Sequence, residues 1–255
     1  MIKKIAGVFR AISGSPHPKN FTSAVIAAAG SSVRFGGDTT KQFTELRGVP
    51  MIVHTLRAFE ACDCIHEIII VAKKNEIAEY DWICKKYHFE KVSAVIAGGY
   101  TRQDSVRRGL DAVSKKSKYI AIADGARCLI TPEQITSVCH AAYKYGAATA
   151  AHRATDTVKL SDKKGFIDTT IDRNTVWLAQ TPQVFKTKLY RAAAYTALKK
   201  KFEATDDNML VEYIKHPIRL VECGSSNLKV TTIEDMVIAT EVLQKRLGAS
   251  GGDET

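Results

Sequence analysis

The chain has 255 residues, of which 45% are hydrophobic and 25% charged, and this composition is typical of a folded globular protein. It contains no run of about 18 uninterrupted apolar residues, so we predict neither a transmembrane helix nor a membrane partner. The formal net charge of +10 is raised by a basic segment at residues 1–20. Outside this segment the excess of basic over acidic residues is modest, and a modest excess does not favour a nucleic-acid partner.

The first 20 residues are predicted to be a flexible N-terminal extension. Arg10 interrupts a short apolar run and no small-residue cleavage site follows it, unlike in a signal peptide. The six cysteines form no C-x-x-C pair, which disfavours a zinc site or a redox motif. Unpaired cysteines are typical of reduced thiols, so we expect a cytoplasmic protein.

From residue 22 onward, short β-type runs alternate with helical ones. Strands are expected at residues 22–29, 66–72, 91–97, 118–124 and 147–152. Helices are expected between them at residues 50–62, 75–87, 102–113 and 131–146, the last with Thr131 as N-cap, Gln134 completing a capping box and Gly146 as stop. Repeated β-α-β units with apolar strands predict an α/β fold, with a mostly parallel sheet covered by helices on both faces.

The regular alternation of strands and helices ends after residue 153. Residues 157–171 read as two strands joined by a turn, a hairpin that is marginal in water unless it packs against something else. Beyond the segment TPQVF at 181–185, we expect helices at 186–200 and 206–215, a strand at 218–223 and a terminal helix from about 232. The tail at 248–255 is expected to be disordered.

The segment AAAGSSVRFGGDTTKQF, residues 27–43, joins small residues to two cations, Arg34 and Lys41. Small residues let the backbone approach a ligand closely, and the cations indicate that the ligand is an anion. The glycines have neither the G-x-G-x-x-G spacing of a dinucleotide site nor the pattern of a P-loop. The loop is therefore expected to surround a triphosphate in a different kind of site. Because Arg34, Gly99 and Asp124 each follow a strand, their loops should meet at one edge of the sheet.

Eight motifs, in order, carry a family resemblance: AAGSSVRFGG…KQF, GGYTRQDSV, ADGAR, TDTVK, IDRN, TPQVF, TDD and NLKVTT. Together they resemble the 2-C-methyl-D-erythritol 4-phosphate cytidylyltransferases, over residues 22–245. The resemblance implies a three-layer nucleotidyltransferase fold with a Rossmann-like twisted sheet, forming a single domain at 21–247 with a protruding β-hairpin arm at about 153–177. The implied reaction joins CTP to the sugar-alcohol phosphate, giving CDP-methylerythritol and pyrophosphate with the aid of Mg²⁺ or another divalent cation.

The same resemblance implies roles for individual residues. Catalysis would use Arg34, Lys41, Arg173 and Lys229. The nucleotide would be contacted by Ala28, Ala29, Gly30, Gly99, Ser105 and Asp124, and Asp124 would also bind the metal. The alcohol phosphate would be contacted by Arg127, Thr157, Arg173, Thr181 and Thr205. Thr157 and Arg173 would act from the arm on a neighbouring subunit, which implies a homodimer.

Two alternatives remain open from the sequence. Ribitol 5-phosphate cytidylyltransferases share the CTP half of the pattern, although TDTVK followed by IDRN is closer to the methylerythritol enzymes. A non-catalytic basic binding module is a more remote alternative, because it would require neither Asp124 nor a loop with two cations. The chain departs from the family pattern at four positions, Ala27, Ser32, Gly125 and Cys128. None of them removes a charged group that the chemistry needs.

Overall fold

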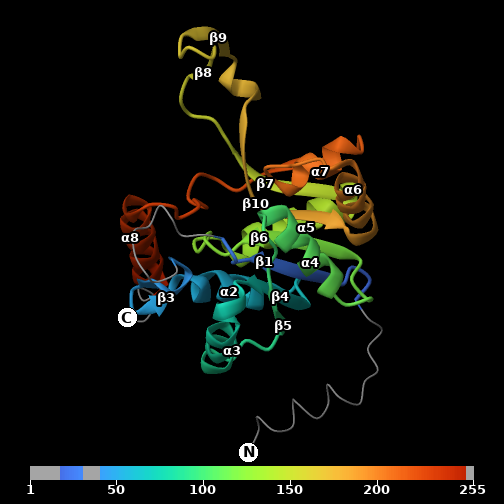
Figure 1. Ribbon diagram of the computed structural model, residues 1–255. Helices are drawn as coiled ribbons and strands as arrows, with labels where there is room; N and C mark the ends of the chain where they lie inside the picture. The colour runs from blue at the N-terminus through green and yellow to red at the C-terminus, as the bar shows by residue number, and fades with distance from the viewer. Residues whose placement is uncertain (1–17, 31–40, 251–255) are drawn as a thin grey trace, which may run out of the picture.

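A seven-stranded sheet forms the centre of the computed structural model, which describes residues 18–30 and 41–250, with side chains as far as residue 246. The strands are β1 (Thr22–Ala27), β4 (Glu67–Ala72), β5 (Val92–Ala97), β6 (Tyr119–Asp124), β7 (Ala147–Arg153), β10 (Trp177–Lys186) and β11 (Arg219–Glu222). Their spatial order is β11-β7-β10-β6-β1-β4-β5, and Figure 1 shows the sheet between its helices.

Most neighbouring strands in this sheet are parallel. Strand β1 pairs in parallel with β4 and β6, β4 with β5, and β7 with β11, whereas β10 is antiparallel to both β6 and β7. The predicted mostly parallel sheet is therefore confirmed, with one antiparallel strand inside it. In the register of β1 and β6, Ala27 lies beside Asp124, so their carboxyl ends share one edge of the sheet.

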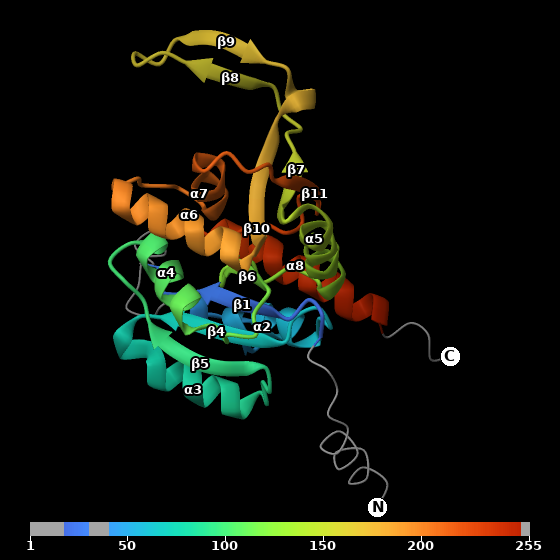
Figure 2. The same cartoon turned by 90° about the vertical axis from the view of Figure 1, so that its right-hand side faces the viewer.

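In the described residues, seven α-helices accompany the sheet: α2 (Met51–Ala61), α3 (Ile77–Lys86), α4 (Arg102–Ala112), α5 (Pro132–Tyr145), α6 (Thr187–Lys200), α7 (Asp207–Tyr213) and α8 (Ile233–Ser250). Helices α2, α3 and α5 share one buried cluster with one face of the sheet, and α4, α6 and α7 share another with the opposite face. Figure 2 shows this layering from the side. The three-layer α/β architecture expected from the sequence is confirmed.

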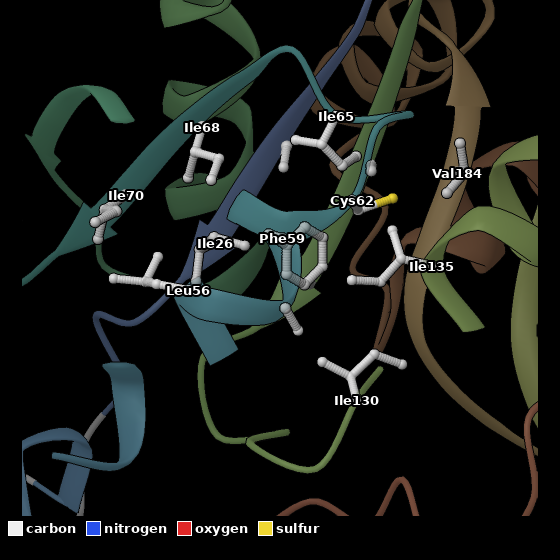
Figure 3. Close-up of a cluster of buried hydrophobic side chains, with 14 of the residues drawn as sticks. Ile26, Leu56, Phe59, Cys62, Ile65, Ile68, Ile70, Ile130, Ile135 and Val184 are labelled. Atoms are coloured by element: carbon white, nitrogen blue, oxygen red, sulfur yellow. The ribbon is translucent and has the colours of Figure 1, made fainter. Parts of the chain in front are cut away.

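The first buried cluster shows how the apolar pattern builds these layers. Successive residues of β1 point to opposite faces, so Ile26 joins the α2 side and Val25 the α4 side. In Figure 3, Leu56 and Phe59 of α2 lie beside Ile26, with Ile135 belonging to the same cluster. All of these side chains are fully buried. Burial of each stabilises the fold by about 1.5–3 kcal/mol.

A two-stranded arm leaves the sheet between β7 and β10. Strands β8 (Val158–Ser161) and β9 (Ile167–Ile171) pair in an antiparallel hairpin, followed by a short 3-10 helix, η4 (Arg173–Thr175). Figure 1 shows the hairpin standing clear of the remaining elements. It exposes Phe166 and Ile167, which are 70% and 66% accessible to solvent. The predicted protruding hairpin is confirmed.

Some local elements differ from the expectations. A second small hairpin, β2 (Glu45–Leu46) and β3 (Val49–Pro50), precedes α2, so Pro50 ends a strand instead of starting the helix. Its two-residue turn has positive φ at Arg47 and Gly48, a geometry that suits a tight hairpin. At the other end, α8 continues to Ser250, so the expectation of disorder from residue 248 is wrong for 248–250. A single glycine, Gly248, costs a helix only about 1 kcal/mol, which lets α8 run through it.

The proposed extension at residues 1–20 lies mostly outside the described residues, as does the rest of the tail. In the described parts of the chain, none of the helices combines the length and apolar character needed to span a bilayer.

Candidate functional site

A cavity of about 440 Å³ opens at the carboxyl edge of the sheet. It is lined by Ala27, Ala29, Gly30, Lys41, Gln42, Gly99, Tyr100, Thr101, Arg102, Ser105, Asp124, Ala126, Lys229 and Thr231. The loops after β1, β5 and β6 therefore meet at one edge, as the order of the strands predicts. Arg34, the second cation predicted in the first loop, lies outside the described residues.

Tight packing between two loops forms one wall of the cavity. A Cβ atom on Gly98 would lie 2.7 Å from the Cβ of Ala29 and 2.8 Å from the hydroxyl of Ser105, so only glycine allows this approach. The Ser105 hydroxyl donates to the Thr101 carbonyl at 2.9 Å and accepts from the Gly99 N–H at 3.0 Å. Ser105 is therefore buried at this wall, where it holds the Gly99 backbone.

The neighbouring Ala28 is buried and does not line the cavity. Its N–H donates to the Val71 carbonyl of β4 at 2.8 Å, which fixes the backbone just before Ala29 and Gly30. Ala28 thus supports the loop from beneath, while the next two residues face the cavity.

Asp124 ends β6 and lies between two cations. Its Oδ2 is 2.9 Å from Lys229 Nζ, and its Oδ1 is 3.3 Å from Arg102 Nε. Burial alone would raise the pKa of this carboxyl, because the Asp124 residue is only 8% exposed. The charges of Arg102 and Lys229 outweigh that effect and lower the pKa below its ordinary value. The cavity therefore contains a carboxylate that stays ionised at neutral pH.

Arg102 also contacts a second carboxylate, deeper in the protein. Its Nη1 lies 2.7 Å from Oδ2 of Asp207, the first residue of α7. The Tyr190 hydroxyl of α6 donates to Asp207 Oδ1 at 2.5 Å. Burial raises the pKa of Asp207, although the Arg102 charge opposes the shift. Arg102 thus joins the edge of the cavity to the interior of the α6–α7 layer.

Lys41 and Lys229 bring two ammonium groups to the same cavity. Lys41 belongs to a 3-10 helix, η2 (Lys41–Phe43), and donates to the carbonyl of Val230 at 2.7 Å. The Val230 N–H donates in turn to the Ala126 carbonyl at 2.9 Å. This contact holds the segment that carries Lys229 against the loop after β6. Three parts of the chain that are distant in sequence therefore bring Lys41, Asp124 and Lys229 to the same cavity.

Two of the predicted substrate contacts lie behind Asp124. The Thr181 hydroxyl accepts from the Asp124 backbone N–H at 3.0 Å and is buried. Arg127 Nη1 donates to the Asn227 carbonyl at 2.6 Å, and its Nε is buried without a hydrogen-bond partner. In this structure both side chains support the backbone around the cavity.

The other three predicted contacts lie elsewhere within the chain. Thr157 and Arg173 are exposed at the arm, where Arg173 Nη1 donates to the Thr155 carbonyl at 2.9 Å. Thr205 is exposed before α7, and its hydroxyl lies 3.1 Å from the sulfur of Met209. None of them lines the cavity of its own chain.

Comparison with known families identifies this arrangement. The family model for IspD, 2-C-methyl-D-erythritol 4-phosphate cytidylyltransferase, matches residues 22–245. The chain belongs to the IspD family. The resemblance carried by the eight sequence motifs is therefore confirmed, and the fold is that of a nucleotidyltransferase-type protein.

Individual IspD relatives are similar over nearly their whole length. The chain is 39% identical to a 2-C-methyl-D-erythritol 4-phosphate cytidylyltransferase of Pelotomaculum thermopropionicum, over 90% of this chain and 98% of the relative. It is 40% identical to one of Caldanaerobacter subterraneus subsp. tengcongensis, over 88% and 99%. A solved 4-diphosphocytidyl-2C-methyl-D-erythritol synthase from Anaerococcus prevotii superposes with a TM-score of 0.79 at 32% identity, covering 88% and 99% of the two chains.

The sequence analysis missed Arg102, which lines the cavity, and its partner Asp207. Both stand inside motifs that carried the resemblance, GGYTRQDSV and TDD, so a signal was present. Their pairing joins residues 105 positions apart, and no local pattern reports such a contact. Gln42 and Thr231, which also line the cavity, likewise lie inside the quoted motifs, KQF and NLKVTT.

The four departures from the family pattern have different settings. Ala27 lines the cavity, and Cys128 is buried in a cluster with Leu46 and Met51. A Cβ atom on Gly125 would lie 2.9 Å from the end of Ile52, so this chain uses the missing side chain to pack α2 closely. Ser32 lies outside the described residues.

Proposed function

We propose that this protein transfers the cytidylyl group of CTP to 2-C-methyl-D-erythritol 4-phosphate, releasing pyrophosphate. The observation that carries the proposal is the ionised Asp124 at the carboxyl edge of the sheet, with the Lys229 ammonium beside it and Lys41 lining the same cavity. A carboxylate among cations in a cavity of this size suits a nucleoside triphosphate and a divalent cation, and the names of the relatives support CTP and the alcohol phosphate.

Electrostatics explains why the reaction needs these groups. The alcohol phosphate has to attack the α-phosphorus of another anion, and two unit charges 4 Å apart repel by about 4 kcal/mol at an effective dielectric of about 20. Lys41 and Lys229, together with Arg34, would offset this repulsion and stabilise the charge that builds at the α-phosphate. Positioning and electrostatics would then supply the catalysis without a covalent nucleophile.

Asp124 is the residue that we propose to hold Mg²⁺. Its donor chemistry fits, because a carboxylate oxygen is a hard ligand and both Asp124 oxygens already neighbour cationic groups. Within the described residues there is no group of three or more His, Cys, Asp or Glu side chains that could hold a metal. A single carboxylate suits Mg²⁺, which commonly takes its remaining ligands from substrate phosphates and water. The bound ion would neutralise phosphate charge.

The nucleotide would lie against the wall built by Ala29, Gly30, Gly99 and Ser105. At Gly98 the two loops pack too closely to admit a side chain, and a wall of closely packed backbone suits the flat face of a base. Ala28 fixes the backbone beneath it. We therefore propose the cytosine end near Ser105 and the triphosphate toward Lys41.

The alcohol phosphate would be met in part by a second subunit. Thr157 and Arg173 stand on the exposed arm, away from the cavity of their own chain. The arm also exposes Phe166 and Ile167, which supports a homodimer whose arms reach the neighbouring sites. Arg127, Thr181 and Thr205 would complete the phosphate site. All six cysteines are unpaired, which supports the proposed cytoplasmic location.

A pyrophosphate-release assay tests the proposed reaction. Purified protein with Mg²⁺ is offered each of the four nucleoside triphosphates, together with either methylerythritol phosphate or ribitol 5-phosphate. We expect release only with CTP and preferentially with methylerythritol phosphate. Preference for ribitol 5-phosphate would identify the alternative alcohol. Absence of release with both alcohols, combined with salt-dependent nucleic-acid binding, would support a binding module instead.

A further inference from the structure

Arg102 joins two carboxylates through different nitrogens of one guanidinium. Its Nε lies 3.3 Å from Asp124 Oδ1, and its Nη1 lies 2.7 Å from Asp207 Oδ2. The planar group therefore spans from the cavity edge to the protein interior. Two contacts from one rigid plane fix its orientation as well as its position.

The interior end of this bridge is firmly held. The Asp207 side chain is 1% exposed, and its Oδ1 accepts from the Tyr190 hydroxyl at 2.5 Å. The Asp207 backbone N–H donates to Gln183 Oε1 of β10 at 2.9 Å. Asp207 is thus bound to α6 and β10 while it starts α7, and it cannot turn away from Arg102 without leaving buried polar groups unpaired.

The two cations on Asp124 differ in how tightly they are held. Arg102 is anchored at its far end by Asp207, and its side chain is 30% exposed. The Lys229 side chain is 42% exposed, and its one ion pair among the described residues is with Oδ2 of Asp124. An ammonium on a flexible stem can leave one carboxylate oxygen for a nearby phosphate far more easily than an anchored guanidinium can.

We propose that Arg102 is a positioning residue that, anchored by Asp207, fixes Oδ1 of Asp124 and so reserves Oδ2 for the divalent cation. This inference rests on the proposed function, in which Asp124 holds the metal. Lys229 occupies Oδ2 in the free protein and releases it when the cation and the triphosphate bind. The released ammonium is then beside the phosphate charge that it neutralises.

Arg102→Lys is the informative substitution. It keeps the positive charge, but a single ammonium has no rigid fork with which to hold Asp124 and Asp207 in fixed directions. Asp207→Asn removes the anchoring charge from the other end of the pair with little change in volume. Arg108→Lys is the matched control, because Arg108 lies on the same helix, is exposed, and has one ion pair among the described residues, with Asp104 at 3.9 Å.

The test measures Mn²⁺ binding in the presence of CTP, by electron paramagnetic resonance of the free ion, on full-length protein. We expect Arg102→Lys and Asp207→Asn to weaken Mn²⁺ binding about tenfold or more, as loss of a partner that orients a metal ligand does elsewhere. The KM for methylerythritol phosphate should stay within about twofold, and Arg108→Lys should match the parent protein in both measurements. Far-UV circular dichroism confirms that each variant is folded. The two variants alter opposite ends of the Arg102–Asp207 pair, so the test can be completed with either variant if the other does not fold.

The outcomes separate this inference from the proposed function. If Arg102→Lys binds Mn²⁺ as tightly as the parent protein while Asp124→Asn does not, Asp124 is the ligand but Arg102 does not position it. If Asp124→Asn also binds Mn²⁺ like the parent, the metal assignment itself is overturned. If Arg102→Lys lowers kcat with no change in Mn²⁺ binding, its role is structural and the inference fails.

Discussion

At the scale of single residues, Asp124 and Asp207 show how one arginine gives two buried carboxyls opposite properties. Burial raises the pKa of both, but Asp124 gains a second cation, Lys229, and its pKa falls below the ordinary value. A lowered pKa means that Asp124 keeps its negative charge as the pH falls through the neutral range and loses it only below the ordinary carboxyl range. Loss of activity between pH 8 and 6 should therefore come from other groups.

Cys64 is a residue whose chemistry should differ from that of the other thiols. A hydrogen bond from Cys139 and the nearby His140 lower the pKa of the Cys64 thiol, whereas burial raises the pKa of Cys84 to about 11. Only the thiolate is alkylated, so Cys64 should react with iodoacetamide at a lower pH than Cys84, which is similarly half-buried. Mass spectrometry of peptides alkylated at stepped pH measures both rates in one sample. Identical pH dependence of the two cysteines would contradict the prediction.

The sequence predicted residues of the site unevenly, for physical reasons. Lys41, Gly99, Ser105, Asp124 and Lys229 follow strands or stand in motifs, and the structure brings them to one cavity. Arg102 has the same type of signal, but its function depends on contacts with Asp207 and Asp124 that only the folded chain creates. Charge pairing over such separations is a tertiary property. It was therefore out of reach of spacing and composition.

At the scale of elements, helix α5 shows how local chemistry can define an element completely. The Thr131 hydroxyl accepts from the Gln134 N–H at 3.3 Å, the Gln134 side chain accepts from the Thr131 N–H at 3.0 Å, and Gly146 ends the helix with φ of +90°. This reciprocal capping box and the glycine stop are those predicted from the sequence. All of the groups involved lie within a few residues of one another, which is why the prediction succeeds.

Removing the cap tests that account. We expect Thr131→Ala to lower the free energy of unfolding by about 1 kcal/mol, because it leaves helix N–H groups without an acceptor. Ser137→Ala is the control, since Ser137 is exposed on the same helix and bonds only to the preceding turn. Urea unfolding followed by circular dichroism measures both variants. An equal loss of stability in the two would show that the cap contributes nothing specific.

The pairing and direction of the strands were harder to predict from the sequence than the positions of the strands. The apolar runs located most strands of the sheet to within a few residues, but the antiparallel direction of β10 depends on the path of the arm. The small β2–β3 hairpin was missed because two-residue strands carry too little pattern to detect. Orientation and pairing are decided by where the chain returns after a connection, and periodicity does not record that.

At the scale of the whole molecule, the arm makes a clear prediction about assembly. If Arg173 acts on the neighbouring subunit, Arg173→Ala and Lys41→Ala damage different contributions to each shared site. Mixing the two inactive variants under conditions that exchange subunits should restore activity, because half of the sites in each mixed dimer receive both intact residues. We expect about a quarter of the activity of the parent protein, given random pairing in a two-fold symmetric dimer.

Control mixtures sharpen that measurement. Each variant mixed with itself should stay inactive, and dilution below the dissociation constant of the dimer should abolish the restored activity. If the mixture remains inactive while sedimentation shows mixed dimers, Arg173 acts within its own chain or has no catalytic role.

Strand β10 links the arm directly to the centre of the sheet. It begins beside the hairpin at Trp177, has an irregular register between Ala179 and Gln183, and there places the Thr181 hydroxyl 3.0 Å from the Asp124 N–H. A single strand therefore runs from the base of the arm to the backbone of the proposed metal ligand. In the proposed homodimer, contact with a neighbour at the arm would therefore act on the same strand that holds the Asp124 backbone.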